Sequence, residues 1–168
     1  EKKINDGLIF GGRNNMHRST KTYGHHEGLS CVFRQPNATH SHCSLLHGYA
    51  LSFRFEFQAR ELDNKNWVVD FGGLKELKQW LKDSFDHKTV VDINDPQKEV
   101  LEGLAEQGLA DIVYFDGVGC EKFAEHALAK ADEIVQRITD GRCYCVSCEV
   151  SEHGANSAIF KRDISSDL

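Results

Sequence analysis

Residues 51–58 are Leu51-Ser52-Phe53-Arg54-Phe55-Glu56-Phe57-Gln58, an alternation of apolar and polar side chains over eight positions. Successive side chains of a β-strand point to opposite faces of a sheet, so this alternation predicts a half-buried strand. Phe53, Phe55 and Phe57 then share one face, which must be covered by a second layer. We therefore expect a sheet whose apolar face is covered by helices.

Other segments on both sides of this strand extend the same pattern. Short β-prone runs are found at 29–34, 67–71, 111–115, 143–150 and 157–160. Apolar residues recur instead at helical spacing in the segments 74–85, 96–107 and 123–138. This order of strands, helices and strands predicts an α+β protein with a mostly antiparallel sheet and helices on one face.

The N-terminal residues 1–27 show no sustained period and contain the pairs Gly-Gly, Asn-Asn and His-His. We interpret residues 1–27 as a loosely packed arm and residues 28–168 as the folded domain. Four main strands make a small sheet with open edges, and open edges invite association unless they are paired. We therefore expect a homo-oligomer in which the sheets of several copies close into a barrel.

The composition of the 168 residues excludes several classes of function. Acidic residues outnumber basic ones, 26 to 20, and no basic block is present, which argues against nucleic acid or an anionic membrane as partner. No apolar run approaches the ~20 residues of a membrane span, and the first residues do not resemble a signal peptide. The six cysteines are therefore interpreted as reduced thiols of a cytoplasmic protein.

The densest group of reactive side chains lies within residues 39–49. His40, His42 and His47 stand beside Cys43, so that three imidazoles and one thiol fall within eight positions. Imidazole and thiolate are natural zinc ligands, and an extended backbone places His40 and His42 on the same side. The segment is either a metal site or a polar loop with incidental histidines.

Two further positions suggest proton transfer and ligand binding. Asp86 and His87 end a predicted helix, where the carboxylate can orient an imidazole that moves protons. The helix dipole alone also favours a histidine at that place. Glu149 lies in a β-like run, where it either faces solvent or accepts two parallel hydrogen bonds from the N–H/NH₂ edge of a guanine or pterin.

Taken together, these segments resemble the 6-pyruvoyl-tetrahydropterin synthase family, which includes the 6-carboxy-tetrahydropterin synthases of the 7-deazaguanine (queuosine) route. The resemblance covers about residues 28–161 and rests, in the family's order, on Cys43-x-x-x-His47-Gly48, Trp67-Val68-Val69-Asp70-Phe71-Gly72-Gly73-Leu74-Lys75, Phe85-Asp86-His87 and Cys148-Glu149. The segment 121–126 lies where the family has a Thr-x-Glu-Asn helix start, and only Glu125 matches it well.

The resemblance implies a tunnelling fold (T-fold) with a ββααββ subunit, assembled into trimeric barrels that stack as a hexamer with sites between subunits. It implies that Cys43 is the catalytic thiol and that Asp86 and His87 form the proton-transfer pair. Glu149 would bind the pterin of the substrate, together with Glu125. The implied enzyme is a lyase that converts 7,8-dihydroneopterin triphosphate to 6-carboxy-tetrahydropterin, with a 6-pyruvoyl product as the alternative.

The implied metal site departs from the family pattern. The family binds zinc through a histidine at the end of the first strand and through both histidines of a His-Gly-His motif. Here those three positions are Phe33, His47 and Tyr49. Zinc is therefore either held by His42 and His40 beside His47, or it is absent. A zinc-less member would bind a pterin or purine-like ligand with altered chemistry, because it lacks the Lewis acid.

Overall fold

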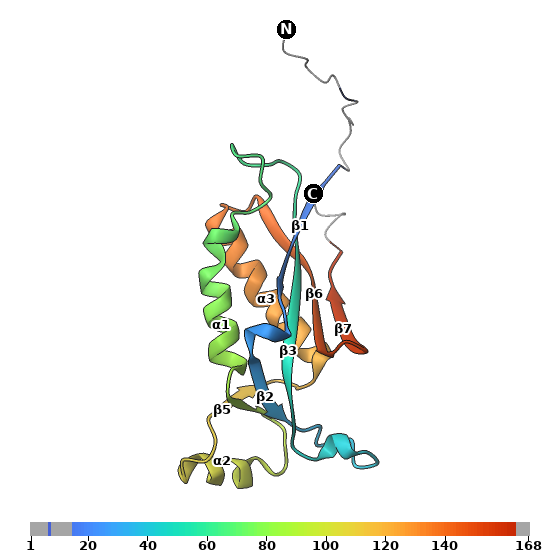
Figure 1. Cartoon of the computed structure of the whole chain (residues 1–168), viewed down its shortest axis with the longest axis vertical. Coiled ribbons are helices and arrows are strands. Elements are labelled where there is room, and N and C mark those ends of the chain that lie inside the picture. Colours follow the sequence, from blue (N-terminus) through green and yellow to red (C-terminus); the bar gives the residue numbers. More distant parts are fainter. Residues whose placement is uncertain (1–6, 8–14, 164–168) are drawn as a thin grey trace.

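The computed structural model describes residue 7 and residues 15–163. Within them the strands are β1 (His17–Tyr23), β2 (Leu29–Phe33), β3 (His47–Ala59), β4 (Lys88–Asp92), β5 (Ile112–Phe115), β6 (Cys143–His153) and β7 (Asn156–Lys161) (Figure 1). The helices are α1 (Lys75–Phe85), α2 (Lys98–Glu106) and α3 (Cys120–Ile138), with short 3₁₀ turns η1 (His25–Glu27), η2 (His42–Ser44) and η3 (Phe71–Leu74). No helix in this part of the chain is long and apolar enough to cross a membrane.

The long strand β3 joins the two halves of the sheet. Its first half pairs antiparallel with β2, and its second half pairs antiparallel with β1 and β6. β7 adds to β6 in antiparallel pairing, whereas β4 and β5 continue beyond β2 in parallel pairing. The sheet is therefore mixed, with the order β5-β4-β2-β3-β6-β7 and β1 also on β3.

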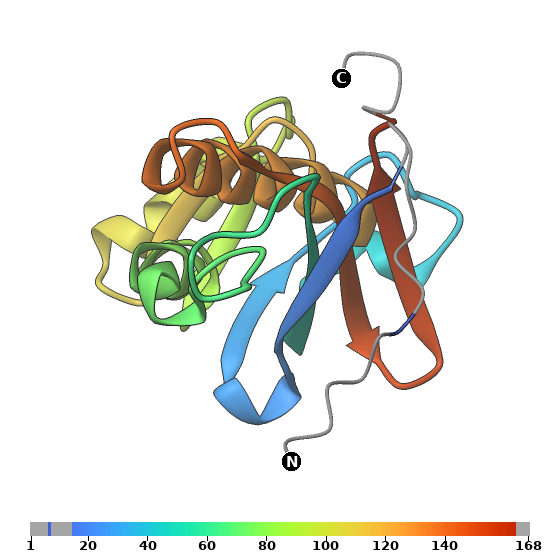
Figure 2. The same cartoon turned by 90° about the horizontal axis from the view of Figure 1, so that it is seen from above.

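The aromatic face of β3 forms the centre of the core, as the alternation predicts. Phe53, Phe55 and Phe57 are fully buried, and the ring of Phe53 packs 4.9 Å from that of Phe85 in α1. The ring of Phe85 in turn packs 5.1 Å from that of Phe123 in α3. Both helices lie on one face of the sheet (Figures 1 and 2). Burial of each phenylalanine contributes roughly 1.5–3 kcal/mol, so this layer accounts for much of the fold's stability.

The prediction of a loosely packed N-terminal arm is wrong for residues 17–27. They form β1 and η1, and Tyr23 at the end of β1 is only 3% exposed. β1 escapes a pattern search because Tyr23 is its only fully buried side chain and its other positions are mostly polar. The remaining arm residues 1–6 and 8–14, and residues 164–168 of the expected domain, lie outside the described residues.

The prediction of a strand at 67–71 is also wrong. The carbonyl of Val68 accepts a hydrogen bond from the Arg142 guanidinium at 2.8 Å, not from a neighbouring strand. The Asp70 carboxylate accepts from the N–H of Gly72 at 2.8 Å, which turns the chain into η3. A strand that the pattern did not predict, β4, lies between α1 and α2, and it produces the parallel end of the sheet.

Candidate active site

Cys43 is placed by a short turn between β2 and β3. Its N–H donates to Oγ of Ser41 at 3.2 Å, and its carbonyl accepts from the N–H of Gln35 at 2.8 Å. All six cysteines are free thiols, and Cys43 is the exposed one. Burial raises the pKa of Cys31 and of Cys120 to about 12, so these thiols stay protonated at neutral pH. Cys43 is therefore the thiol best able to meet a substrate.

Arg34 holds the Cys43 turn against the rest of the fold. Its Nη1 donates to the carbonyl of Ser44 at 2.8 Å, next to Cys43. Its Nε and Nη2 donate to the two carboxylate oxygens of Asp95, both at 2.8 Å. These hydrogen bonds hold the pKa of Asp95 below its usual range. A two-pronged ion pair of this kind fixes direction as well as distance, so Arg34 orients the turn.

Three rings gather where β2 ends and β3 begins. The strand register pairs Phe33 with His47, and Tyr49 lies two residues farther along β3 on the same face as His47. Their ring centres are 5.1 Å (Phe33 to His47), 5.5 Å (His47 to Tyr49) and 6.3 Å (Phe33 to Tyr49) apart. The Nδ1 of His47 lies 2.7 Å from the carbonyl of Leu45, to which it must donate, so Nε2 keeps its lone pair.

A carboxylate that the sequence patterns did not single out, Glu152, borders these rings. Burial and then the Glu152 charge raise the pKa of Cys120, whose thiol lies within hydrogen-bonding reach of Glu152. The Glu152 charge is also the main cause of the raised pKa of Tyr49. The ring of Tyr49 lies 6.1 Å from that of His153. The end of β6 and the start of α3 therefore complete one wall around the three rings.

The predicted substrate carboxylate Glu149 has different surroundings. It pairs in register with Arg54, on the face of β3 opposite the buried phenylalanines, and accepts from Oγ of Ser157 at 3.1 Å. Arg54 is seven residues from His47, roughly 23 Å of extended chain. The structure therefore does not bring Glu149 to the Cys43 end of its own chain.

The other predicted substrate carboxylate, Glu125, lies on the exposed side of α3. It forms an ion pair with Lys122 one turn earlier on the same helix, at 3.2 Å, and both side chains are about half exposed. Such a pair is typical of a solvated helix surface. Within the described residues, no contact joins Glu125 to Cys43 or to His87.

Asp86 and His87 follow α1 directly and form the expected pair. The Oδ1 of Asp86 lies 2.6 Å from Nδ1 of His87, so the carboxylate orients the imidazole. The N–H of His87 donates to the carbonyl of Ser30 in β2 at 2.7 Å, and its φ of 59° is uncommon for a residue with a side chain. The imidazole is 89% exposed.

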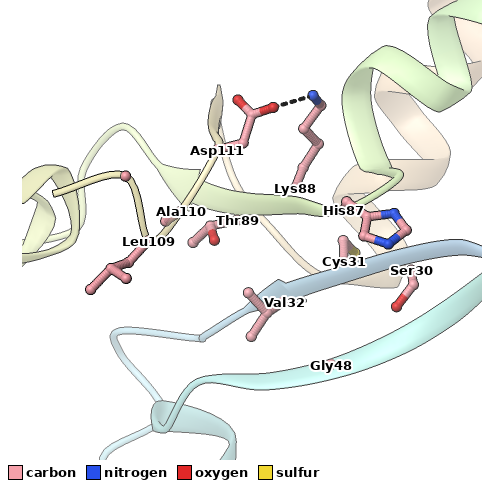
Figure 3. A pocket seen from close by; sticks show the side chains of 11 residues that line it. Ser30, Cys31, Val32, Gly48, His87, Lys88, Thr89, Leu109, Ala110 and Asp111 are labelled. Carbon is pink, nitrogen blue, oxygen red and sulfur yellow. Dashed lines mark hydrogen bonds and ion pairs between the residues drawn. The ribbon is translucent and has the colours of Figure 1, made fainter. Parts of the chain in front are cut away.

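His87 borders an open cleft of about 500 Å³ between β2, β4 and the turn before β5 (Figure 3). Ser30 and Thr89 line its wall, and Lys88 forms an ion pair with Asp111 at its far side. The cleft places the His87 imidazole beside polar groups and is large enough for a bicyclic ring.

Cys43 and the Asp86–His87 pair lie apart within one chain. His87 is attached to β2 at Ser30, and Cys43 is attached at Gln35, five residues farther. That separation is roughly 16 Å of extended chain. Among the described residues, no contact joins the thiol to the imidazole.

The residues at the family's metal position do not fit a zinc ion. Of Phe33, His47 and Tyr49, the phenyl ring has no donor atom, and a phenol is not among the usual zinc ligands. His40 and His42 are both exposed, in the segment between β2 and β3. In the part of the chain that the structure describes, no three His, Cys, Asp or Glu side chains gather in a way that could hold a metal.

Comparison of the sequence with known proteins gives a family. The model of a family described as 6-pyruvoyl tetrahydropterin synthase matches residues 22–163. The 6-carboxy-5,6,7,8-tetrahydropterin synthases of Rickettsia conorii and Rickettsia bellii are 32% and 34% identical over 56 residues. That stretch is 33% of this chain and 41% of each relative, so the match spans about two fifths of the relatives' length.

Comparison of the structure gives the fold. It is similar to an uncharacterised protein of Wolinella succinogenes, with a TM-score of 0.71 and 18% identity over 89% of this chain and 99% of that one. The 6-pyruvoyl tetrahydropterin synthase of Plasmodium falciparum gives a TM-score of 0.63 and 14% identity over the same shares. This confirms the predicted T-fold. Since the family model spans nearly the whole described structure, the chain belongs to the 6-pyruvoyl tetrahydropterin synthase family.

Proposed function

We propose that this protein is a pterin lyase that converts 7,8-dihydroneopterin triphosphate to 6-carboxy-tetrahydropterin, in the cytoplasm and on the queuosine route. Family membership makes it a pterin-processing enzyme, and its relatives in Rickettsia carry the name of this activity. The observation that carries the proposal is the 2.6 Å hydrogen bond between Asp86 and His87 at the mouth of a cleft. It is the geometry of a base whose ring is held by a carboxylate.

The reaction needs groups that remove a proton from a side-chain carbon of the substrate and return one elsewhere. Because the Asp86 carboxylate accepts from Nδ1 of His87, Nε2 of His87 is left as the proton acceptor. Cys43 supplies a second acid–base group as thiolate or thiol. The two groups can act on different carbons of one side chain.

The active site needs a second copy of the chain under this proposal. Cys43 and His87 lie too far apart in one subunit to act on one substrate, so the His87 cleft of one copy must face the Cys43 turn of another. Free edges on β1, β5 and β7 offer places where a second copy can extend the sheet. We propose a homo-oligomer, a hexamer, with sites between subunits.

The experiment is incubation of the purified protein with 7,8-dihydroneopterin triphosphate, with release of triphosphate and acetaldehyde as readouts. The wild type is expected to release both, and Cys43→Ala is expected to release neither while it still binds the pterin. Release of triphosphate alone would favour the 6-pyruvoyl product. Binding without any release would favour the second candidate, a family member that only binds a pterin, which the lack of two metal ligands at Phe33 and Tyr49 supports.

A further inference from the structure

We infer that the end of the β2–β3 pair is a three-ligand metal site in which two ligands have been exchanged for aromatic residues. The chain then holds no zinc there, but its backbone keeps the arrangement that zinc requires. Two substitutions, Phe33→His and Tyr49→His, should therefore restore zinc binding. The inference concerns zinc content and does not depend on the proposed reaction.

The spacing of the three rings is the first reason. Around one tetrahedral zinc, with each nitrogen ~2.0–2.1 Å from the metal, the centres of three imidazole rings lie roughly 5 Å apart. The rings of Phe33, His47 and Tyr49 have centres 5.1, 5.5 and 6.3 Å apart. Two of the three spacings match the value for zinc-bound imidazoles, and the third, between Phe33 and Tyr49, is longer by about 1 Å.

The backbone between the rings is the second reason. A Cβ on Gly48 would lie 2.9 Å from the carbonyl oxygen of Cys31, so the close approach of β2 and β3 requires a glycine there. This close pairing sets Phe33 opposite His47 and keeps Tyr49 on the same face. The strands therefore hold the geometry whether or not a metal is present.

The chemistry of the side chains is the third reason. Phe33 is 1% exposed and packs edge to face on Phe123 in α3, at 5.2 Å between ring centres. The Phe33 ring occupies the position of a metal ligand but has no lone pair to offer. Its packing on Phe123 holds the end of β2 against α3. Of the three side chains, His47 alone offers a donor of the usual kind, through Nε2, and one imidazole does not retain zinc.

The test compares zinc content in the full-length wild type and in the Phe33→His/Tyr49→His variant, each produced with added zinc and dialysed against a weak chelator. We expect below about 0.1 zinc per chain in the wild type and about 1 in the variant. Cobalt(II) should give the absorption of a tetrahedral site in the variant alone. Adding His47→Ala to the variant should abolish both signals, and the matched variant Phe33→Leu/Tyr49→Phe should stay free of metal.

About one zinc per wild-type chain would overturn the inference, and His40→Ala, His42→Ala and His47→Ala would then identify the ligands. A double variant that folds, as judged by circular dichroism, but takes up no zinc would overturn it as well. If the loss of Phe33 prevents folding, Tyr49→His alone provides two imidazoles. That variant should bind cobalt at least tenfold more tightly than the wild type, and equal binding would contradict the inference.

Discussion

Two carboxylates of β6 lie three residues apart and have different neighbours. Glu149 faces the polar side of the sheet beside Arg54, whereas Glu152 lies at the strand end next to Cys120 and Tyr49. The motif Cys148-Glu149 pointed to the first of them. The register of β6 against β3 gives Glu149 and Glu152 different neighbours, and a sequence pattern does not contain this register.

These surroundings predict different effects on ligand binding. Glu152 and Cys43 both act on Tyr49, so Glu152 is the carboxylate that we expect to bind the pterin edge. Glu152→Gln should therefore weaken pterin binding by ~30-fold or more, because an amide cannot accept two hydrogen bonds from that edge. Glu149→Gln should change affinity by less than about threefold, because Glu149 pairs in register with Arg54, away from the Cys43 end of the subunit. Titration calorimetry with a dihydropterin measures both. A larger loss of affinity in Glu149→Gln than in Glu152→Gln would show that Glu149 binds the pterin.

The exposure of Cys43 predicts selective alkylation. Iodoacetamide reacts with thiolates, and burial raises the pKa of Cys120 to about 12 and of Cys143 to about 11. In the native protein at about pH 7.5, iodoacetamide should therefore label Cys43 first. The native Cys43→Ala variant should take up little label. Peptide mass spectrometry locates the label, and labelling in denaturant, where all six thiols should react, is the control. Equal labelling of Cys120 in the native state would refute the prediction.

The candidate site residues that the sequence predicted lie close together along the chain. Asp86 and His87 are neighbours, so their pairing needs no knowledge of the fold, and the structure joins them at 2.6 Å. Cys43 in η2 and His47 at the start of β3 are four positions apart. Glu152 and Cys120 come from β6 and α3, and only the folded chain brings them together. Patterns along the chain find local pairs, and they miss pairs made by tertiary packing.

At the scale of elements, Arg34 connects β2, the Cys43 turn and the loop before α2. The pKa of Asp95 is lowered chiefly by its hydrogen bonds from Arg34, so the folded state favours the carboxylate. Its contribution to stability is complete above the unfolded pKa of about 3.9 and is lost as pH falls through the lower folded pKa. Asp95→Asn should therefore be less stable than the wild type at pH 7, and the difference should shrink below about pH 4.

Urea unfolding at a series of pH values measures this difference. Asp111→Asn is the matched control, because Asp111 is 65% exposed in its pair with Lys88 and such pairs contribute about 0–1 kcal/mol. Amide exchange of the Cys43 turn should also rise in Asp95→Asn, since Arg34 then loses its charged partner. A difference in stability that does not depend on pH would argue against the Asp95 carboxylate as its source.

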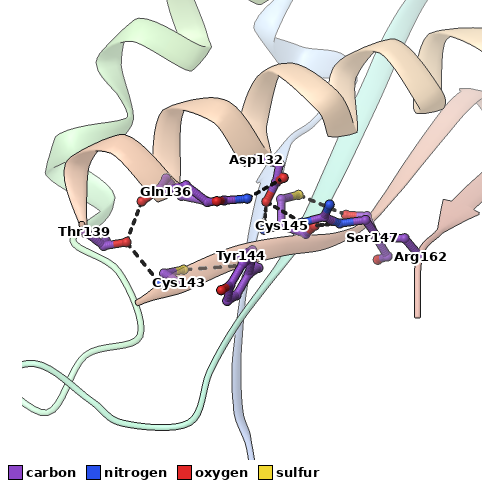
Figure 4. Close-up of polar contacts among 9 residues, drawn as sticks. Asp132, Gln136, Thr139, Cys143, Tyr144, Cys145, Ser147 and Arg162 are labelled. Atoms are coloured by element: carbon purple, nitrogen blue, oxygen red, sulfur yellow. Dashed lines mark hydrogen bonds and ion pairs between the residues drawn. The ribbon is translucent and has the colours of Figure 1, made fainter. Parts of the chain in front are cut away.

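A second connection between elements joins α3 to both C-terminal strands (Figure 4). The Asp132 carboxylate accepts from the N–H of Cys145 at 3.0 Å, from Gln136 at 2.8 Å and pairs with Arg162 at 2.7 Å. Asp132→Ala should lower the free energy of unfolding by roughly 2–4 kcal/mol, because it leaves a buried N–H without an acceptor. Denaturant unfolding measures this, with Asp83→Ala on the exposed side of α1 as control. Equal stability of the two variants would show that the network is not needed.

The elements differ in how well the sequence predicts them, for physical reasons. β3 has one buried and one exposed face, so its alternation is plain. β4 is buried over Thr89 to Val91 and has no alternation to detect. The run 67–71 has strand-forming residues but no neighbouring strand, because Arg142 binds its carbonyl groups. The intrinsic preference of a segment for strand or helix therefore predicts an element only where the fold also supplies matching hydrogen-bond and packing partners.

At the scale of the whole molecule, the separation of Cys43 from His87 determines what one chain can do. The thiol lies beyond the end of β2, and His87 is hydrogen-bonded near the start of β2, at Ser30, roughly 16 Å of chain away. Among the described residues, β1, β5 and β7 each have an edge that no other strand pairs with. If copies join along these edges, each site takes its thiol from one copy and its imidazole from another. Light scattering should then report an oligomer, and a 19.0 kDa particle would contradict it.

Mixing two inactive variants tests this arrangement directly. Cys43→Ala and His87→Ala should each be inactive alone, since each removes one of the two groups that we propose to transfer protons. When the two are co-expressed in equal amounts, random assembly gives about a quarter of the sites both native groups, so about a quarter of wild-type turnover should return. A site built within one chain gives no recovery, because every chain lacks one group. The same variants mixed after purification, without exchange of subunits, should stay inactive and serve as the control.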